Sequence, residues 1–159
     1  GKDDEIFVAK QILSQLGGVI VPASLEEDTK DHVDFWWIKL DGERVGVDVK
    51  GMRKKSGYDI RPNKDITWLE CKNARGAPGW LYGKAKYFAF RRIGLTVFVD
   101  REKLVSYAEN LVRGKQVVSV RPTLCGIPYT RARWGRNDIT MMVSLDDIQS
   151  LADFVLLNS

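Results

Sequence analysis

The chain has 159 residues, of which 44% are apolar and 29% are charged, and its net charge is +4. A chain of this length forms one compact domain with a substantial core. It contains no apolar run near the roughly 20 residues that span a bilayer, and its polar, acidic beginning, residues 1–5, is unlike a signal peptide. We therefore expect no membrane association and an intracellular, cytoplasmic location.

Metal-binding classes are also limited by composition. The two cysteines, Cys71 and Cys125, form no CxxC pattern, and the chain has a single histidine. Zinc sites built from cysteine or histidine are thereby excluded, and the cysteines are expected to be free thiols in a reducing compartment. Any metal would be a hard cation held by carboxylates.

Charge is distributed unevenly along the chain. Residues 1–50 carry a net charge of −5, residues 51–94 carry +8 and residues 95–159 carry +1. A basic middle segment is typical of proteins that bind a polyanion. Carboxylates beside it would repel that polyanion unless a divalent cation lay between them, which points toward phosphodiester chemistry.

The first half of the chain shows clear periodicity. Apolar residues at helical spacing predict a helix over 4–16, which ends at Gly17 and Gly18. The elements expected next are a short strand at 19–22, an acidic loop at 23–32, a strand at 33–40, a turn at 41–43, a return strand at 44–50, a basic loop at 52–64 and a third strand at 66–72.

The second half is read in the same way. It predicts a Gly/Pro loop at 73–79, a helix at 80–92, a strand at 94–99, a helix at 101–112 capped by Asp100, a strand at 139–144 and a last helix at 145–151 opened by Ser144, with 117–120 as a further candidate strand. This order favours an α/β fold with a mixed central sheet flanked by helices. We expect a single domain, 1–159, with a core over about 4–112 and a small C-terminal αβ extension over about 113–159.

The hairpin at 33–50 carries the most informative side chains. Residues two apart in a strand share a face, so Asp48 and Lys50 point the same way. Asp34 begins the partner strand, and the turn brings it beside Asp48. Two adjacent carboxylates repel unless a cation neutralises them, and Mg²⁺ binds through one or two carboxylates plus water and phosphate oxygens. Lys50 is placed to hold the attacking water or to neutralise the phosphate.

This pattern resembles the signature of the PD-(D/E)XK nuclease superfamily, with Asp34 followed after thirteen residues by Asp48-Val49-Lys50. The superfamily includes restriction endonucleases, Holliday junction resolvases of the phage and archaeal type, and repair nucleases. The resemblance covers about two thirds of the chain and implies a restriction-endonuclease-like αβββαβ core. One departure is Val33, which stands where the superfamily often has proline.

The resemblance also implies the composition of the site. It places Mg²⁺, with Mn²⁺ as a substitute, at Asp34, Asp48 and Val49. The superfamily often adds a carboxylate from the first helix, for which Glu5 matches in position and Asp4 is a lesser candidate. Glu5 has an alternative interpretation as a charge that favours the helix N-terminus.

A second E-x-K sequence, Glu70-Cys71-Lys72, lies on the third strand. One interpretation makes it the true catalytic pair and leaves residues 48–50 structural. The other, which we favour, places the third strand beside the second, so that Glu70 assists metal or water binding and Lys72 contacts phosphate. A third is an exposed ion pair on an edge strand.

Basic and aromatic residues elsewhere are candidates for contact with the nucleic-acid backbone or bases. A solvated surface is the alternative for the loops, and core packing for the aromatic residues. The set comprises Arg53, Lys54, Lys55, Arg61, Lys64, Arg75, Trp80, Lys84, Lys86, Arg131, Arg133 and Arg136.

Together these features predict a Mg²⁺-dependent endonuclease that hydrolyses DNA. A structure-selective enzyme acting on branched DNA fits the small basic chain, and a homodimer is the arrangement that resolvases of this superfamily use. The DNA would be that of a nucleoid or a virus. The alternatives are a non-catalytic nucleic-acid-binding protein with the same fold and an RNA-cleaving nuclease.

Overall fold

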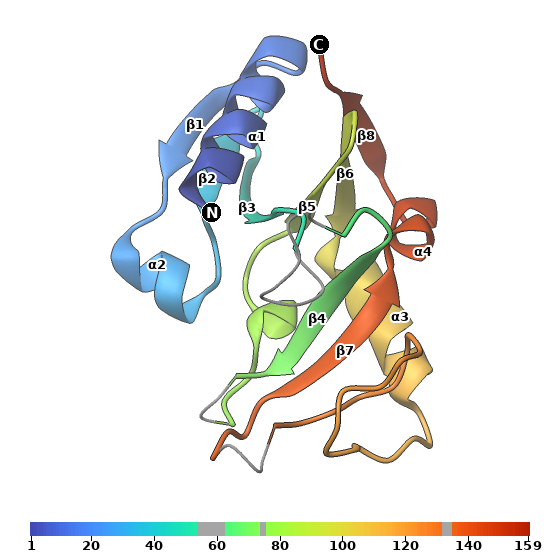
Figure 1. Cartoon of the computed structure of the whole chain (residues 1–159). Coiled ribbons are helices and arrows are strands. Elements are labelled where there is room, and N and C mark those ends of the chain that lie inside the picture. Colours follow the sequence, from blue (N-terminus) through green and yellow to red (C-terminus); the bar gives the residue numbers. More distant parts are fainter. Residues whose placement is uncertain (54–62, 74–75, 132–134) are drawn as a thin grey trace.

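The computed structural model describes residues 1–53, 63–73, 76–131 and 135–159. Its elements are α1 (Lys2–Gln15), β1 (Val19–Pro22), α2 (Leu25–Lys30), β2 (Phe35–Ile38), β3 (Arg44–Lys50), β4 (Ile66–Lys72), the 3₁₀ turn η1 (Trp80–Tyr82), β5 (Tyr87–Arg92), β6 (Leu95–Asp100), α3 (Arg101–Val112), β7 (Ile139–Ser144), α4 (Leu145–Ser150) and β8 (Phe154–Leu157). Figure 1 shows how these elements are arranged.

The main sheet has six strands in the order β1-β2-β3-β5-β6-β8. Only the β3–β5 pair is parallel, and the other four neighbours are antiparallel. The expectation of an α/β fold with a mixed sheet flanked by helices is therefore confirmed. The first helix, the 33–50 hairpin and the helices that follow Asp100 and Ser144 are also where the sequence predicts them.

The helix expected over 80–92 is wrong. Its first residues form η1, and its last residues form β5, a central strand. The sequence of β5, Tyr-Phe-Ala-Phe-Arg-Arg, is rich in the aromatic residues that suit a buried pleated surface. Gly94, at φ 83°, then turns the chain directly into β6. Strand pairing on both sides outweighs the weak helical pattern.

The expected position of the third strand is also wrong. β4 does not lie beside β3: it pairs antiparallel with β7 in a separate two-stranded sheet. Figure 1 shows β4 and β7 side by side, away from α1. The predicted C-terminal extension is thus joined to the core twice, since β7 pairs with β4 and β8 pairs with β6. The 117–120 stretch forms only a bridge between Val118 and Tyr129.

Two apolar clusters cover the two faces of the main sheet. On one face, Phe88, Phe90 and Val97 pack with residues of β4, β7, α3 and α4. On the other, Val47, Ala89 and Phe98 pack beneath α1. Because side chains alternate along a strand, Asp48 and Lys50 lie on the first face. Within the described residues, no helix is long and apolar enough to cross a membrane.

Candidate active site

The β2–β3 hairpin places Asp34 beside Asp48. Phe35 pairs with Val47 in the antiparallel ladder, and the N–H of Asp34 donates to the carbonyl oxygen of Val47 at 2.9 Å, which extends the register by one residue. The carboxylate of Asp34 then turns toward β3, where its Oδ2 accepts a hydrogen bond from the Val49 N–H at 2.7 Å. The hairpin thus brings the Asp34 carboxylate beside Asp48.

Asp48 is a buried carboxylate, with 3% of its surface exposed. Its Oδ1 lies 3.1 Å from the Lys50 ammonium, whereas its Oδ2 is buried and has no hydrogen-bond partner among the described residues. Burial raises the pKa of Asp48 to about 7, Lys50 opposes that rise and the Asp34 charge adds to it. A buried carboxylate oxygen without a donor is costly, so this oxygen is suited to a cation.

Asp34 also contacts carboxylates on two helices. Burial raises the pKa of Glu5 to about 7, and its contact with Asp34 adds to the rise. The pKa of Asp28 in α2 is raised for the same two reasons. Asp4, the other candidate from α1, is instead paired with Arg91 at 2.7 Å. The structure therefore brings Glu5, and not Asp4, to Asp34.

Asp28 was not anticipated, because the sequence predicts an acidic loop over 23–32. That expectation is wrong, since residues 25–30 form α2. Ser24 and Glu27 cap the helix reciprocally: the Glu27 N–H donates to Ser24 Oγ, and the Ser24 N–H donates to the Glu27 carboxylate. A Ser-x-x-Glu sequence is the usual sign of such a cap, and this signal could have located the helix.

The donor set suits a hard cation with few protein ligands. Among the residues that the structure describes, no three His, Cys, Asp or Glu side chains are arranged to hold a metal ion. A site here would rest on Asp34 and Asp48, and Mg²⁺ commonly uses one or two carboxylates and keeps several waters. The side chain of Val49 is in the core, so only its main-chain carbonyl could serve as the predicted ligand.

Glu70 and Lys72 are in a different place from the one expected. Because β4 pairs with β7, the strand adjacency that was to bring them to Asp48 does not exist. Lys72 is exposed and Glu70 half-buried. A Cβ built on Gly79 would lie 2.8 Å from Glu70 Cγ, so the Glu70 side chain packs against the start of η1.

Three of the basic residues predicted to contact nucleic acid are held in ion pairs with carboxylates. Lys84 pairs with Asp31 at 3.4 Å, Lys86 with Asp100 at 3.1 Å and Arg136 with Asp138 at 3.3 Å. Arg53, Lys64 and Arg131 are exposed. The remaining basic candidates, Lys54, Lys55, Arg61, Arg75 and Arg133, lie outside the described residues.

Trp80 does not present a free face to a base. Only 7% of its surface is exposed. Its ring packs edge-on against Phe88, with centroids 5.2 Å apart, and its face is covered by Lys50, whose ammonium lies 4.0 Å from the ring centroid. The expectation that Trp80 stacks on unpaired bases is therefore wrong, and core packing, the alternative, is what the structure shows.

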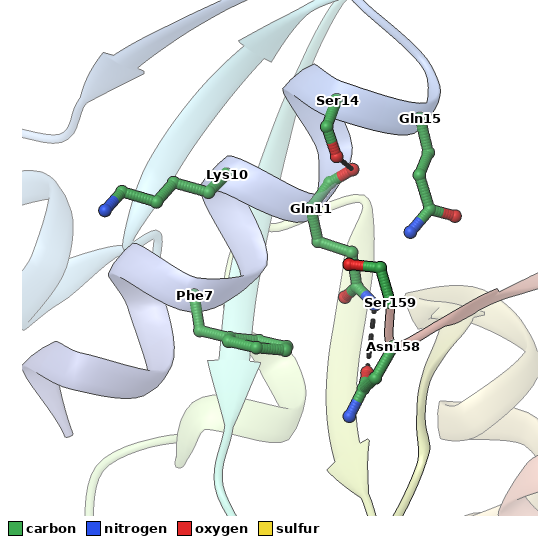
Figure 2. Close-up of a pocket in the computed structure, with 7 residues that line it drawn as sticks. All are labelled: Phe7, Lys10, Gln11, Ser14, Gln15, Asn158 and Ser159. Atoms are coloured by element: carbon green, nitrogen blue, oxygen red, sulfur yellow. Dashed lines mark hydrogen bonds between the residues drawn. The ribbon is translucent and has the colours of Figure 1, made fainter.

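A surface pocket lies elsewhere, between α1 and the C-terminal residues (Figure 2). Gln11 spans it, donating from Nε2 to Asn158 Oδ1 at 3.1 Å and to the Leu156 carbonyl oxygen at 3.2 Å. Lys10 is the charged residue in its lining, which includes none of the predicted site residues. These amide contacts join the first helix to the end of β8 and have a structural role.

Comparisons with protein-family models, with curated proteins and with solved structures found no match.

Proposed function

We propose that this protein is a metal-dependent nuclease of the restriction-endonuclease-like fold that hydrolyses phosphodiester bonds in DNA. The observation that carries the proposal is Asp48: a buried carboxylate, beside Asp34, with one oxygen on Lys50 and the other without a partner among the described residues. A packing role alone does not account for a carboxylate and an ammonium held together near the end of an apolar strand.

Each residue has a role that its environment favours. Asp34 and Asp48, with the Val49 carbonyl, would hold Mg²⁺ or Mn²⁺, which supplies charge neutralisation at phosphate and a lower pKa for water. Among the described residues, Lys50 is the cation that forms an ion pair with Asp48, and it would orient the attacking water or stabilise charge on the phosphate. Glu5, beside Asp34, is suited to accept a proton or to bind a water in the same site.

The test is a cleavage assay on linear, flapped, forked and four-way DNA, with labelled RNA in parallel, in Mg²⁺, in Mn²⁺, in Ca²⁺ and in EDTA. We expect DNA cleavage in Mg²⁺ or Mn²⁺, binding without turnover in Ca²⁺ and no cleavage in EDTA. Cleavage of RNA alone would reassign the substrate. Binding without cleavage under every condition would favour the non-catalytic alternative, and cleavage that survives chelation would remove the metal mechanism.

The basic segment after β3 is expected to set the salt dependence of DNA binding. Replacing Arg53, Lys54 and Lys55 together with alanine should weaken binding equally on all sequences. Each lost phosphate contact should reduce the slope of log K against log salt by about 0.9 on duplex DNA. Binding titrations at several salt concentrations measure this slope.

A Lys84/Lys86 double alanine variant is the comparison, because phosphate would have to displace Asp31 and Asp100 from these lysines. Its slope should change less. An unchanged slope in the triple variant would place the DNA on another surface.

Glu70→Gln is expected to lower turnover by less than Asp48→Asn does, most visibly at low Mg²⁺. Glu70 packs against the beginning of η1, whose Trp80 covers Lys50, so an effect of Glu70 on turnover would be transmitted through that turn. Turnover measured across a Mg²⁺ titration checks this, with Lys72→Ala beside it. Wild-type turnover at every Mg²⁺ concentration would make Glu70 purely structural.

A further inference from the structure

The Lys50 ammonium is held from two sides. Asp48 Oδ1 lies 3.1 Å from Nζ, and the centroid of the Trp80 ring lies 4.0 Å from it. The Lys50 side chain is only 16% exposed. An ammonium over an indole face is attracted by the ring quadrupole, and this attraction strengthens as water is excluded.

The position of Trp80 depends on a close backbone approach. The N–H of Gly79 donates to the Cys71 carbonyl oxygen at 2.9 Å. A Cβ at Gly79 would lie 2.3 Å from the carbonyl oxygen of Glu70, so a larger residue does not fit without a shift of the backbone. Gly79 therefore lets η1 begin directly against β4, which delivers the indole to the face of the sheet that carries Lys50.

The second support of the indole comes from the main sheet. Trp80 packs edge-on against Phe88, and Phe88 is the register partner of Asp48 in the parallel β3–β5 pair. The indole is thus held between β4 and β5, the strand that pairs with β3 at Asp48. Lysine has a long, flexible side chain, and fixing it in one conformation costs conformational entropy. Because Asp48 and Trp80 contact the Lys50 ammonium from two sides, they determine where its positive charge lies.

We propose that Trp80 is a positioning residue for Lys50, holding its ammonium against Asp48 through the face of the indole. The contact itself is independent of what the protein does. Its consequence for turnover rests on the proposed nuclease function: a displaced ammonium would stabilise the transition state less well while substrate binding stays nearly unchanged.

The first experiment observes the contact without any activity. The side-chain signals of Lys50 are assigned by NMR from their loss in Lys50→Ala. In the wild type we expect the ε-methylene protons to be shifted upfield by the ring current of the indole. Trp80→Leu should return them to the position of the other lysines, and Trp80→Phe, which retains an aromatic face, should keep part of the shift. Unshifted Lys50 signals in the wild type would overturn the proposal.

The second experiment separates positioning from loss of packing. Trp80→Leu is expected to lower kcat about tenfold with little change in KM, and Trp80→Phe to recover much of it. Trp37→Leu is the matched control, since Trp37 is also buried, at 4% exposed against 7% for Trp80, and lies in the cluster on the opposite face of the sheet. It should lower thermal stability comparably and leave kcat and the Lys50 signals unchanged. Trp80→Met replaces the leucine variant if the latter does not fold.

The outcomes distinguish this proposal from the proposed function. If Trp80→Leu loses the Lys50 shift but its kcat equals that of Trp37→Leu, the positioning role is refuted and nuclease activity stands. If the shift is present but no nucleic acid is cleaved by the wild type, the proposed function is refuted together with the role in turnover, and only the contact remains.

Discussion

Asp48→Asn is expected to reduce DNA cleavage by about 10³-fold, because it would remove one ligand of the proposed metal ion, whose charge would supply several kcal/mol of transition-state stabilisation. Asp34→Asn and Lys50→Ala should have effects of the same order, with folding and DNA binding largely preserved. The measurement is single-turnover cleavage at saturating Mg²⁺, alongside binding in Ca²⁺ and a circular dichroism spectrum of each variant.

Asp138→Asn is the matched control for this series. Asp138 is also buried, at 6% exposed, and its Oδ1 likewise has no hydrogen-bond partner in the described part of the chain. It precedes β7, outside the hairpin that holds Asp34, Asp48 and Lys50. Near-wild-type cleavage by any of the three hairpin variants would show that the residue concerned has been assigned the wrong role.

Asp48→Asn is also expected to raise the free energy of unfolding of the metal-free protein above neutral pH. The pKa of Asp48 is about 7 in the folded state against 3.8 as the ordinary value. The folded protein therefore binds more protons than the unfolded chain between these limits, and the free energy of unfolding falls as pH rises from about 4 to about 7. Asparagine cannot ionise, so Asp48→Asn should flatten this part of the profile.

The expected gain at pH 8 without metal is on the order of 1–2 kcal/mol. A pKa rise of this size corresponds to on the order of 4 kcal/mol, and loss of the Lys50 ion pair offsets part of it. Urea unfolding in EDTA at pH 5 and pH 8 measures the effect.

A divalent cation should make the wild type more stable than Asp48→Asn, the reverse of the order expected without metal. A ligand that binds only the folded state stabilises it by about 2.7 kcal/mol at one hundred times its Kd. Ca²⁺ should accordingly raise the melting temperature of the wild type and leave that of Asp48→Asn nearly unchanged. If Asp48→Asn is the less stable protein in EDTA at pH 8, the Asp48 carboxylate is satisfied within the fold and is not kept for a cation.

The sequence by itself determined the hairpin and its chemistry. The hairpin depends on local features, namely the alternating valines, the Asp41-Gly42 turn and the spacing of Asp34 from Asp48 and Lys50. The turn sets the register of the two strands, so no distant segment is needed to align them. The first helix and the helices after Asp100 and Ser144 were likewise predictable, since their periodicity and caps lie within a few residues of one another. These local features alone bring the two aspartates together.

Only the tertiary structure decided the surroundings of that site. Residues 87–92 become a central strand because β3 and β6 pair with them on both sides, a long-range gain that local propensity does not report. β4 pairs with β7, more than sixty residues later in the chain, so no local signal separates it from the main sheet. The contact of Trp80 with Lys50 arises from these same long-range pairings, because η1 packs against β4 and Phe88 of β5 lies in register with Asp48. Sequence spacing fixes which residues share a strand face, whereas the packing of distant segments decides what covers that face.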